Sequence, residues 1–298
     1  MRFAGILPTL FVLCLCFRAN IASDENSKMQ RSMMAPFLVP QLYSCVKTRV
    51  PRANEYKSQS HEDIWLYKNI FEKLPLNEIL GGTFLEIGAF NGLDISNTYF
   101  FEKKLDFRGV LIEGHPANLI RPSQAQRSSS AIFTVAICDT VEGQVGNLTF
   151  SKAAGAVGTS VSSASPGFMK EFHGNDSNGP TVACVPIQSI IDSTGLIDID
   201  LFSLDVEGAE LIVLMTLDFE ITNIRVLMVE LDGSNVEKDD AVRKLLVSKG
   251  FEPSKTSVRT ACRNKEKGCM KNEVFMNPQY NSRKRPRQNY QYGSGVKC

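Results

Sequence analysis

The sequence predicts an α/β protein built on a mainly parallel β-sheet, with helices on both faces and an antiparallel β excursion. From Thr83 onward, apolar runs of strand length alternate with stretches of helical character, which is the pattern of βαβ units. A glycine-rich segment, 141–176, interrupts this alternation and has the character of short antiparallel strands and loops. The chain has 298 residues, of which 43% are hydrophobic and 22% charged, so it can form one large domain or two small ones.

The expected folded domain does not include the two ends of the chain. Residues 1–23 have the charged start, apolar core and small-residue end of a secretory signal peptide. The apolar run is shorter than the roughly 20 residues of a membrane span, so we expect cleavage near Ser23, with a retained signal anchor as the alternative. Residues 24–58 are then an extended lead-in, 59–278 the folded domain and 279–298 a basic disordered tail.

Within the domain, a packing helix is expected first. In the segment 61–80, two acids, Glu62 and Asp63, occupy the first turn, where the helix dipole favours them. The apolar residues at helical spacing share one face, and they are Ile64, Tyr67, Ile70, Phe71 and Leu74. Apolar runs then predict strands over 83–88, 109–114, 131–139, 197–208, 224–233 and 272–277. Helices are expected over 94–105, 115–124, 209–217 and 239–249, and segment 182–196 is expected to return to the sheet and then form a helix.

The first predicted strand runs into a glycine turn. Glu86, Gly88 and Gly92 have the spacing E-x-G-x-x-x-G, and in an open parallel sheet such a turn lets a ligand approach the backbone beyond the strand ends. Glu113 ends the second strand about 20 residues later, where an acid can hold the hydroxyls of a ribose, and Asp139 ends the third, where it can reach an adenine amine. These residues predict a nucleotide-like cofactor. A simple tight turn and solvated strand ends are the alternatives.

A second group of acids follows the fourth strand. Asp205, Glu207 and Glu210 crowd one strand-to-helix junction, and Glu230 ends the next strand. Asp205 and Glu207 are the candidate catalytic residues, because a carboxylate at the tip of a buried strand is placed for proton transfer or substrate binding. The helix dipole offers a structural alternative for Glu207 and Glu210. Mutual repulsion makes a divalent cation a further alternative, but we assign no metal site from the sequence.

The cysteines predict a disulfide framework. Of the eight, Cys14 and Cys16 lie in the signal, which leaves an even number. We predict a disulfide between Cys138 and Cys184, since both are expected near the cofactor edge, with small buried thiols as the alternative. Further pairs are expected between Cys262 and Cys269, which bracket a short loop, and by elimination between Cys45 and Cys298.

Two glycosylation sequences agree with a secretory route. Asn147 begins N-L-T and Asn175 begins N-D-S, and both are acceptors if the chain enters the lumen. The formal net charge of +1, from 33 basic and 32 acidic residues, gives no electrostatic reason to expect a nucleic acid partner.

Taken together, residues from about Thr83 to Pro278 resemble the FkbM family of S-adenosylmethionine-dependent methyltransferases, in particular its eukaryotic branch that includes Star-like proteins. The segments that carry the resemblance are "FLEIGAFNG", "SNTYFFEK", "GVLIEGHP", "FSLDVEGAEL", "VLMVELDG" and "NEVFMNP". The resemblance implies a Rossmann-like class I methyltransferase fold, with Glu86, Gly88 and Gly92 in the cofactor turn, Glu113 on the ribose, and Asp205 and Glu207 in the signature junction. Bacterial members typically have a lysine where this sequence has Ser203.

These observations lead to an expected function. We expect S-adenosylmethionine-dependent O-methylation of a glycan or a small hydroxylated acceptor in the secretory pathway, in the lumen of the endoplasmic reticulum or Golgi or after secretion. No stable membrane span is expected after signal cleavage. A catalytically inactive, Star-like binding or trafficking protein of the endoplasmic reticulum and Golgi is the alternative. A secreted protein that binds polyanions through the basic run "RKRPR" is a third reading.

Overall fold

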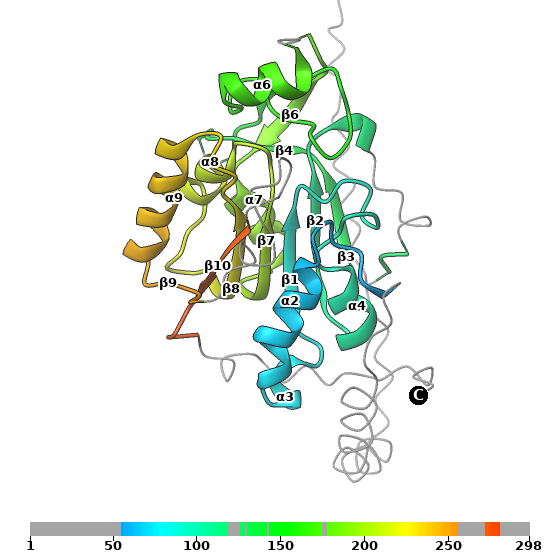
Figure 1. Ribbon diagram of the computed structural model, residues 1–298, viewed down its shortest axis with the longest axis vertical. Helices are drawn as coiled ribbons and strands as arrows, with labels where there is room; N and C mark the ends of the chain where they lie inside the picture. The colour runs from blue at the N-terminus through cyan, green and yellow to red at the C-terminus, as the bar shows by residue number, and fades with distance from the viewer. Residues whose placement is uncertain are drawn as a thin grey trace, which may run out of the picture. The chain divides into compact units, whose positions relative to one another are not determined.

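Seven strands form the central sheet of the computed structural model, in the order β3-β2-β1-β7-β8-β10-β9 (Figure 1). The structure describes residues 55–118, 126–128, 130–141, 143–174, 178–255 and 272–280, all within the unit Val46–Cys298. The strands are β1 (Thr83–Ile87), β2 (Arg108–Glu113), β3 (Ser130–Thr134), β7 (Asp198–Leu204), β8 (Asn223–Glu230), β9 (Glu252–Pro253) and β10 (Asn272–Met276). From β3 through β2, β1 and β7 to β8, each strand pairs in parallel with the next, whereas β10 is antiparallel to both of its neighbours. This confirms the predicted mainly parallel sheet.

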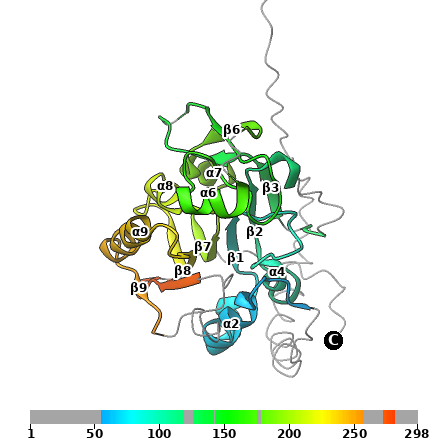
Figure 2. The same ribbon diagram turned by 45° about the horizontal axis from the view of Figure 1, so that its top comes forward.

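Helices cover both faces of this sheet, as Figure 2 shows for α2 and α4 on one side and α7 and α8 on the other. The helices are α2 (Glu62–Asn69), α3 (Leu76–Ile79), α4 (Tyr99–Leu105), α6 (Pro166–His173), α7 (Ile187–Thr194), α8 (Glu210–Met215) and α9 (Val236–Ser248), with 3-10 turns η2 (Phe71–Lys73) and η3 (Pro116–Asn118). Strands of a sheet covered on both faces are apolar at consecutive positions. In β7, six of the seven residues are buried, which explains its continuous apolar run.

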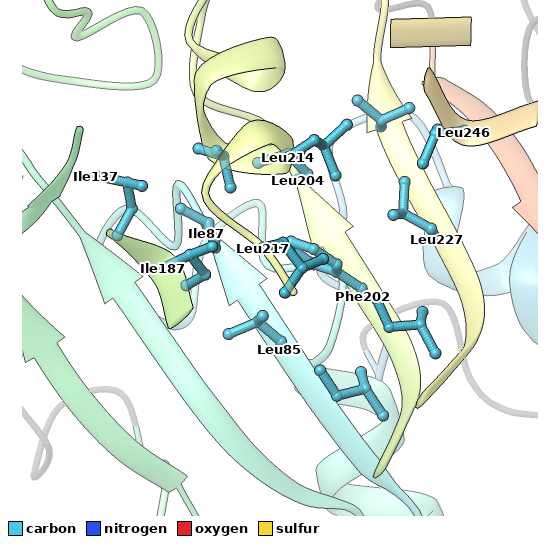
Figure 3. Packing of buried hydrophobic residues seen from close by; sticks show 14 of the residues in the cluster. Leu85, Ile87, Ile137, Ile187, Phe202, Leu204, Leu214, Leu217, Leu227 and Leu246 are labelled. Atoms are coloured by element: carbon cyan, nitrogen blue, oxygen red, sulfur yellow. The ribbon is translucent and has the colours of Figure 1, made fainter. Parts of the chain in front are cut away.

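The alternation of side chains along each strand divides the core into two layers. Leu85 and Phe202 pack with Leu214 of α8 on one face (Figure 3). Phe84 packs on the opposite face with aromatic side chains of α4, including Phe101. Burial of each such side chain contributes about 1.5–3 kcal/mol, so the two layers together fix the strand positions on which the site depends.

A second, three-stranded sheet has the order β4-β6-β5, with β4 (Ala136–Ile137), β5 (Gly146–Thr149) and β6 (Thr181–Val185). This sheet and α6 lie beyond one end of the long strands (Figures 1 and 2). A disulfide joins Cys138, just after β4, to Cys184 in β6, with a Cα–Cα distance of 5.6 Å, so that prediction is confirmed.

Some expectations about the elements were wrong. The segment 131–139 is not one strand, because the chain leaves the central sheet at Val135 and Ala136 pairs with Cys184 in the second sheet. The returning segment 182–196 likewise joins the second sheet through β6 before forming α7. The glycine-rich segment contains α6, which was not predicted, in addition to β5 and loops.

The expected helices also differ in detail. The helix in segment 61–80 ends at Asn69, and its acids Glu62 and Asp63 occupy the first turn as predicted, where both are buried. Asp63 accepts hydrogen bonds from the backbone N–H groups of Lys57 and Ser58 (2.8 and 3.2 Å), which satisfies its charge. The last helix begins at Val236, three residues before the predicted start at Asp239.

Several predictions lie outside the described residues: the signal segment 1–23, most of the lead-in, residues 281–298 of the tail, Cys45, Cys262, Cys269, Cys298 and Asn175. Within the part of the chain that the structure describes, none of the helices has the length and apolar character needed to cross a membrane.

Candidate active site

The site is built where the order of the central sheet reverses, between β1 and β7. In open parallel sheets, ligands bind beyond the carboxyl ends of the strands at this point. The backbone N–H of Asp205 donates to the carbonyl oxygen of Ile87 (3.1 Å), which holds the loop after β7 against the end of β1. The N–H groups of Gly88 and Ala89 donate to Ile112 of β2 (3.0 and 3.1 Å), so three adjacent strand ends share one fixed edge.

A cavity of about 740 Å³, including space open to solvent, lies at this edge. Its polar lining comes from the carboxyl ends of the long strands and includes Glu113, Asp205 and Glu207. Its apolar wall comes mainly from the segment that leaves the central sheet, and comprises Val135, Ala136, Ile137, Leu148 and Phe150. The antiparallel excursion therefore supplies much of the apolar wall of the cavity.

Glu113 is the acid of β2 in this cavity, as the sequence predicted. One carboxylate oxygen accepts a hydrogen bond from the N–H of Phe90 (2.9 Å), and the other accepts from the N–H of His115 (2.7 Å) and the amide of Asn118 (3.3 Å). Burial raises the pKa of Glu113 to about 7, although these hydrogen bonds act in the opposite direction. The side chain is therefore held in one orientation beside the cavity.

Glu86 and Gly92 do not line the cavity, although both were predicted to bind a cofactor. The buried Glu86 carboxylate accepts hydrogen bonds from the Ser96 hydroxyl (2.8 Å) and the Asn97 N–H (2.7 Å), and from Thr98. The buried Arg127 guanidinium donates to the Gly92 carbonyl (3.2 Å) and to Ser96 and Thr98 (2.9 and 2.7 Å). The turn acid thus fixes the loop that follows β1 instead of facing the cavity.

Asp139 is also absent from the cavity lining. Because the chain turns into the second sheet after β3, Asp139 follows β4 and is exposed. The predicted contact of Asp139 with an adenine amine depended on an unbroken third strand, which the structure does not have.

Three acids meet at the ends of β7 and β8. One carboxylate oxygen each from Asp205, Glu207 and Glu230 lies within 4.8 Å of the others. Burial raises the pKa of Asp205 to about 7, and burial together with the charge of Asp205 raises that of Glu207 to about 9. The pKa of Glu230 is raised most clearly by burial, and its carboxyl is hydrogen-bonded to that of Asp205. Sequence reasoning noted Glu230 at a strand end, but only the adjacency of β7 and β8 brings it to Asp205.

Neighbouring groups fix the junction that carries two of these acids. Glu207 adopts a left-handed backbone conformation (φ 54°), and its carbonyl accepts a hydrogen bond from the Thr159 hydroxyl (2.7 Å). Glu210, at the start of α8, accepts from the N–H of Gly208 (2.9 Å) and pairs with Lys238. Glu210 therefore serves the structure of the loop, as the helix-dipole alternative anticipated.

A second, polar cavity adjoins the first and shares Asp205 with it; its volume of about 350 Å³ is mostly space open to solvent. Its polar lining is Gln59, Glu62, Asn97, Ser203, Asp205 and Asn272. The Asn97 amide donates to the Ser203 hydroxyl (3.0 Å), and the Asn272 amide donates to Glu62 (3.1 Å). The buried Asn272 Oδ1 has no hydrogen-bond partner in the described part of the chain. No local sequence signal marked this cavity, since its polar residues come from four separate segments.

This sheet order, with a cavity at the reversal point and an acid ending the second strand, defines a methyltransferase of the Rossmann-like class. The family model described as "Methyltransferase FkbM domain" matches residues 86–253, more than half of the chain, and the chain belongs to this family. It is therefore an S-adenosylmethionine-dependent methyltransferase. A comparison with curated proteins gave no match.

The cavity fits S-adenosylmethionine as the methyl donor. The cavity lining provides an apolar wall suited to the adenine ring and one carboxylate, that of Glu113, suited to the ribose hydroxyls. Asp205 stands at the boundary with the polar cavity, since it lines both.

Proposed function

We propose that this methyltransferase transfers the methyl group to a hydroxyl oxygen of a small polyhydroxylated molecule or glycan. The observation that carries the proposal is the position of Asp205, which lines both the donor cavity and the polar cavity. The polar cavity presents amide, hydroxyl and carboxylate groups, which bind hydroxyl groups through hydrogen bonds.

Each residue of the site has a proposed role. Glu113 accepts hydrogen bonds from the ribose hydroxyls, and Phe150 and Ile137 contact the adenine ring. When bound, S-adenosylmethionine supplies an electrophilic methyl group on a sulfonium sulfur. Asp205 orients the acceptor hydroxyl and accepts its proton, with Glu207 beside it in the donor cavity.

Of the three predicted members of the cofactor turn, Gly88 lines the donor cavity, whereas Glu86 and Gly92 act indirectly. Glu86 positions the loop from Gly88 to Thr98 through its buried hydrogen bonds. Gly92 contributes its carbonyl to Arg127. We assign no role in donor binding to Asp139, since it is exposed and outside the cavity lining.

The proposed setting is the secretory pathway, in the lumen of the endoplasmic reticulum or Golgi or after secretion. The signal-like pattern of residues 1–23 supports this setting. The Cys138–Cys184 disulfide supports it as well, because disulfides persist in oxidising compartments.

Asn147 is exposed on β5, so a glycosylating enzyme can reach it. A glycosidase-sensitive mass that disappears in Asn147→Gln would support luminal entry. An unmodified Asn147 in protein isolated from cells would count against it.

A second candidate function is that of a Star-like binding or trafficking protein of the endoplasmic reticulum and Golgi, which keeps the fold without catalysis. The observation in its favour is Ser203, which replaces the lysine typical of bacterial members and lies in the polar cavity beside Asp205. Glu113→Ala separates the candidates in cells. Lost cellular function supports donor use, whereas full function without donor binding supports the scaffold.

The experiment that tests the proposed function is methyl transfer from labelled S-adenosylmethionine to a panel of glycans and small polyhydroxylated molecules. The wild-type protein should label an oxygen of at least one acceptor, and Asp205→Asn should lower kcat by about 10²–10⁴-fold while the donor still binds. Transfer to nitrogen or carbon acceptors alone, or an active Asp205→Asn, would contradict the proposal.

A further inference from the structure

Asp205, Glu207 and Glu230 are arranged as a set of oxygen ligands. Their nearest carboxylate oxygens lie within 4.8 Å of one another. Two oxygens that contact one Mg²⁺ at about 2.1 Å are at most about 4.2 Å apart, so small side-chain rotations that bring these oxygens a few tenths of an ångström closer place all three on a common ion.

Asp205 and Glu230 share a proton through their hydrogen bond, and no ion pair in the described part of the chain balances the charge that remains on the three acids. Among the described residues, no lysine, arginine or histidine forms an ion pair with any of the three. Lys238, the nearest basic residue of α9, pairs instead with Glu210 and Asp239.

An independent observation points to a ligand at this place. Oε1 of Glu207 has no hydrogen-bond partner among the described residues, and the Glu207 residue is only 7% exposed. A buried carboxylate oxygen without a donor costs about 1–3 kcal/mol or more, and a bound cation removes that cost.

The geometry points to a divalent cation site formed by Asp205, Glu207 and Glu230, which holds Mg²⁺ or Mn²⁺ next to the methyl acceptor. An all-oxygen ligand set favours these hard cations over Zn²⁺. Three protein ligands leave coordination positions open, and Asp205 lines both cavities, so an acceptor bound beside Asp205 lies next to the cation.

This inference rests on the proposed function and specifies its acceptor class. A cation with two open positions binds two adjacent oxygens, so the acceptor carries vicinal hydroxyl groups. Contact with the cation lowers the pKa of the acceptor hydroxyl. Its O–H bond breaks, with the proton passing to the second oxygen of Asp205, and an O–CH₃ bond forms. The S–CH₃ bond breaks with its electron pair remaining on sulfur, so no other reactant is needed.

The test is Mn²⁺ binding to the full-length protein, followed by electron paramagnetic resonance, with thermal unfolding in Mg²⁺ or EDTA as the second readout. We expect one bound Mn²⁺ and a higher Tm in Mg²⁺ than in EDTA. Glu230→Gln and Asp205→Asn should each weaken Mn²⁺ binding at least tenfold. The matched control is Glu237→Gln, which removes an exposed acid of α9 and should bind Mn²⁺ as the wild type does.

Folding of the variants is checked in EDTA, where loss of one buried acid should leave Tm unchanged or raised because repulsion decreases. The inference would be overturned if the wild type bound no Mn²⁺ at millimolar concentration. It would also be overturned if Glu230→Gln and Asp205→Asn both bound Mn²⁺ with the affinity of the wild type. Donor binding is measured in EDTA on the same samples. A protein that binds S-adenosylmethionine but no Mn²⁺ refutes the cation site alone. A protein that binds Mn²⁺ through these acids but no S-adenosylmethionine refutes the proposed function instead.

Discussion

Gly88 lies so close to Asp205 that a Cβ atom added to the glycine would come 1.6 Å from the Asp205 carbonyl oxygen. The obstacle is backbone, which cannot move aside as a flexible side chain can. Gly88 also has φ +83°, a conformation that side-chain-bearing residues rarely adopt. The turn after β1 and the junction after β7 therefore fit together only when the turn residue is glycine.

Gly88→Ala should consequently destabilise the protein by about 2–4 kcal/mol and abolish donor binding. The control is Gly195→Ala, because Gly195 has φ +69° but no atom within 4 Å of an added Cβ. That variant should lose only about 1 kcal/mol and bind the donor normally. Urea unfolding gives both values, and equal losses in the two variants would show that steric contact with Asp205 is unimportant.

The buried Arg127 should contribute strongly to stability. It pairs with Glu102 (2.7 Å) and lies 3.9 Å from Glu86, so its removal takes a cation away from two buried carboxylates, of which Glu102 keeps its pair with Lys103 (3.2 Å). We expect Arg127→Met to lower the free energy of unfolding by about 3–5 kcal/mol. Arg243→Met, which breaks more exposed pairs with Asp240 and Glu273, should cost about 1 kcal/mol or less. Similar costs for the two arginines in urea unfolding would refute this account.

The Cys138–Cys184 disulfide should stabilise the fold and the apolar wall of the cavity. It spans 46 residues of sequence, and closing such a loop contributes roughly 4 kcal/mol in the chain-entropy model. Cys138→Ala/Cys184→Ala should therefore unfold at lower urea concentration than the oxidised wild type. A non-reducing peptide map reports the pairing directly, and two free thiols in protein from an oxidising compartment would contradict it.

Donor binding should depend on pH through Glu113. Its pKa is raised to about 7 by burial, so its carboxylate becomes protonated as the pH falls through that value. Because the charged form is the better acceptor for ribose hydroxyls, the affinity for S-adenosylmethionine should fall below about pH 7. Glu113→Gln should bind more weakly at every pH and lose this dependence, as calorimetry between pH 5.5 and about 8.5 can establish.

The same shift predicts the pH dependence of stability. A carboxyl whose folded-state pKa is raised stabilises the fold below its unfolded pKa of 4.5, and this contribution is lost as the pH rises through about 7. The difference in free energy of unfolding between wild type and Glu113→Gln should change over that window. A constant difference would show that Glu113 is not buried as described.

The sequence predicted the long strands because β1, β2, β7 and β8 are mainly apolar runs whose residues are buried at consecutive positions. It could not show that the third run divides at Val135, because a chain that changes sheets there keeps its apolar character. Helix α6 did carry usable signals. The Ser165 side chain caps its first turn, Pro166 begins it and Gly174 ends it. The glycines around these positions obscured them.

The candidate site was predictable to the extent that it depends on strand ends. Glu113 and Asp205 reach the cavity because each follows a buried strand of a parallel sheet. Glu86 lies one residue before the end of β1, and its side chain turns to the loop, where Ser96, Asn97 and Thr98 offer hydrogen-bond donors. Asn272 joins the polar cavity from β10, far along the chain, and only the order of the sheet places it there.

The central claim is that this fold binds S-adenosylmethionine in the cavity beside Glu113, and calorimetry on the oxidised protein tests it most directly. The wild type should bind one equivalent, and Glu113→Ala should weaken binding by about 10–100-fold through the loss of charge-assisted hydrogen bonds. Glu237→Gln should bind as the wild type does. No heat of binding from the folded wild type at millimolar S-adenosylmethionine, or equal affinity in Glu113→Ala, would contradict the account.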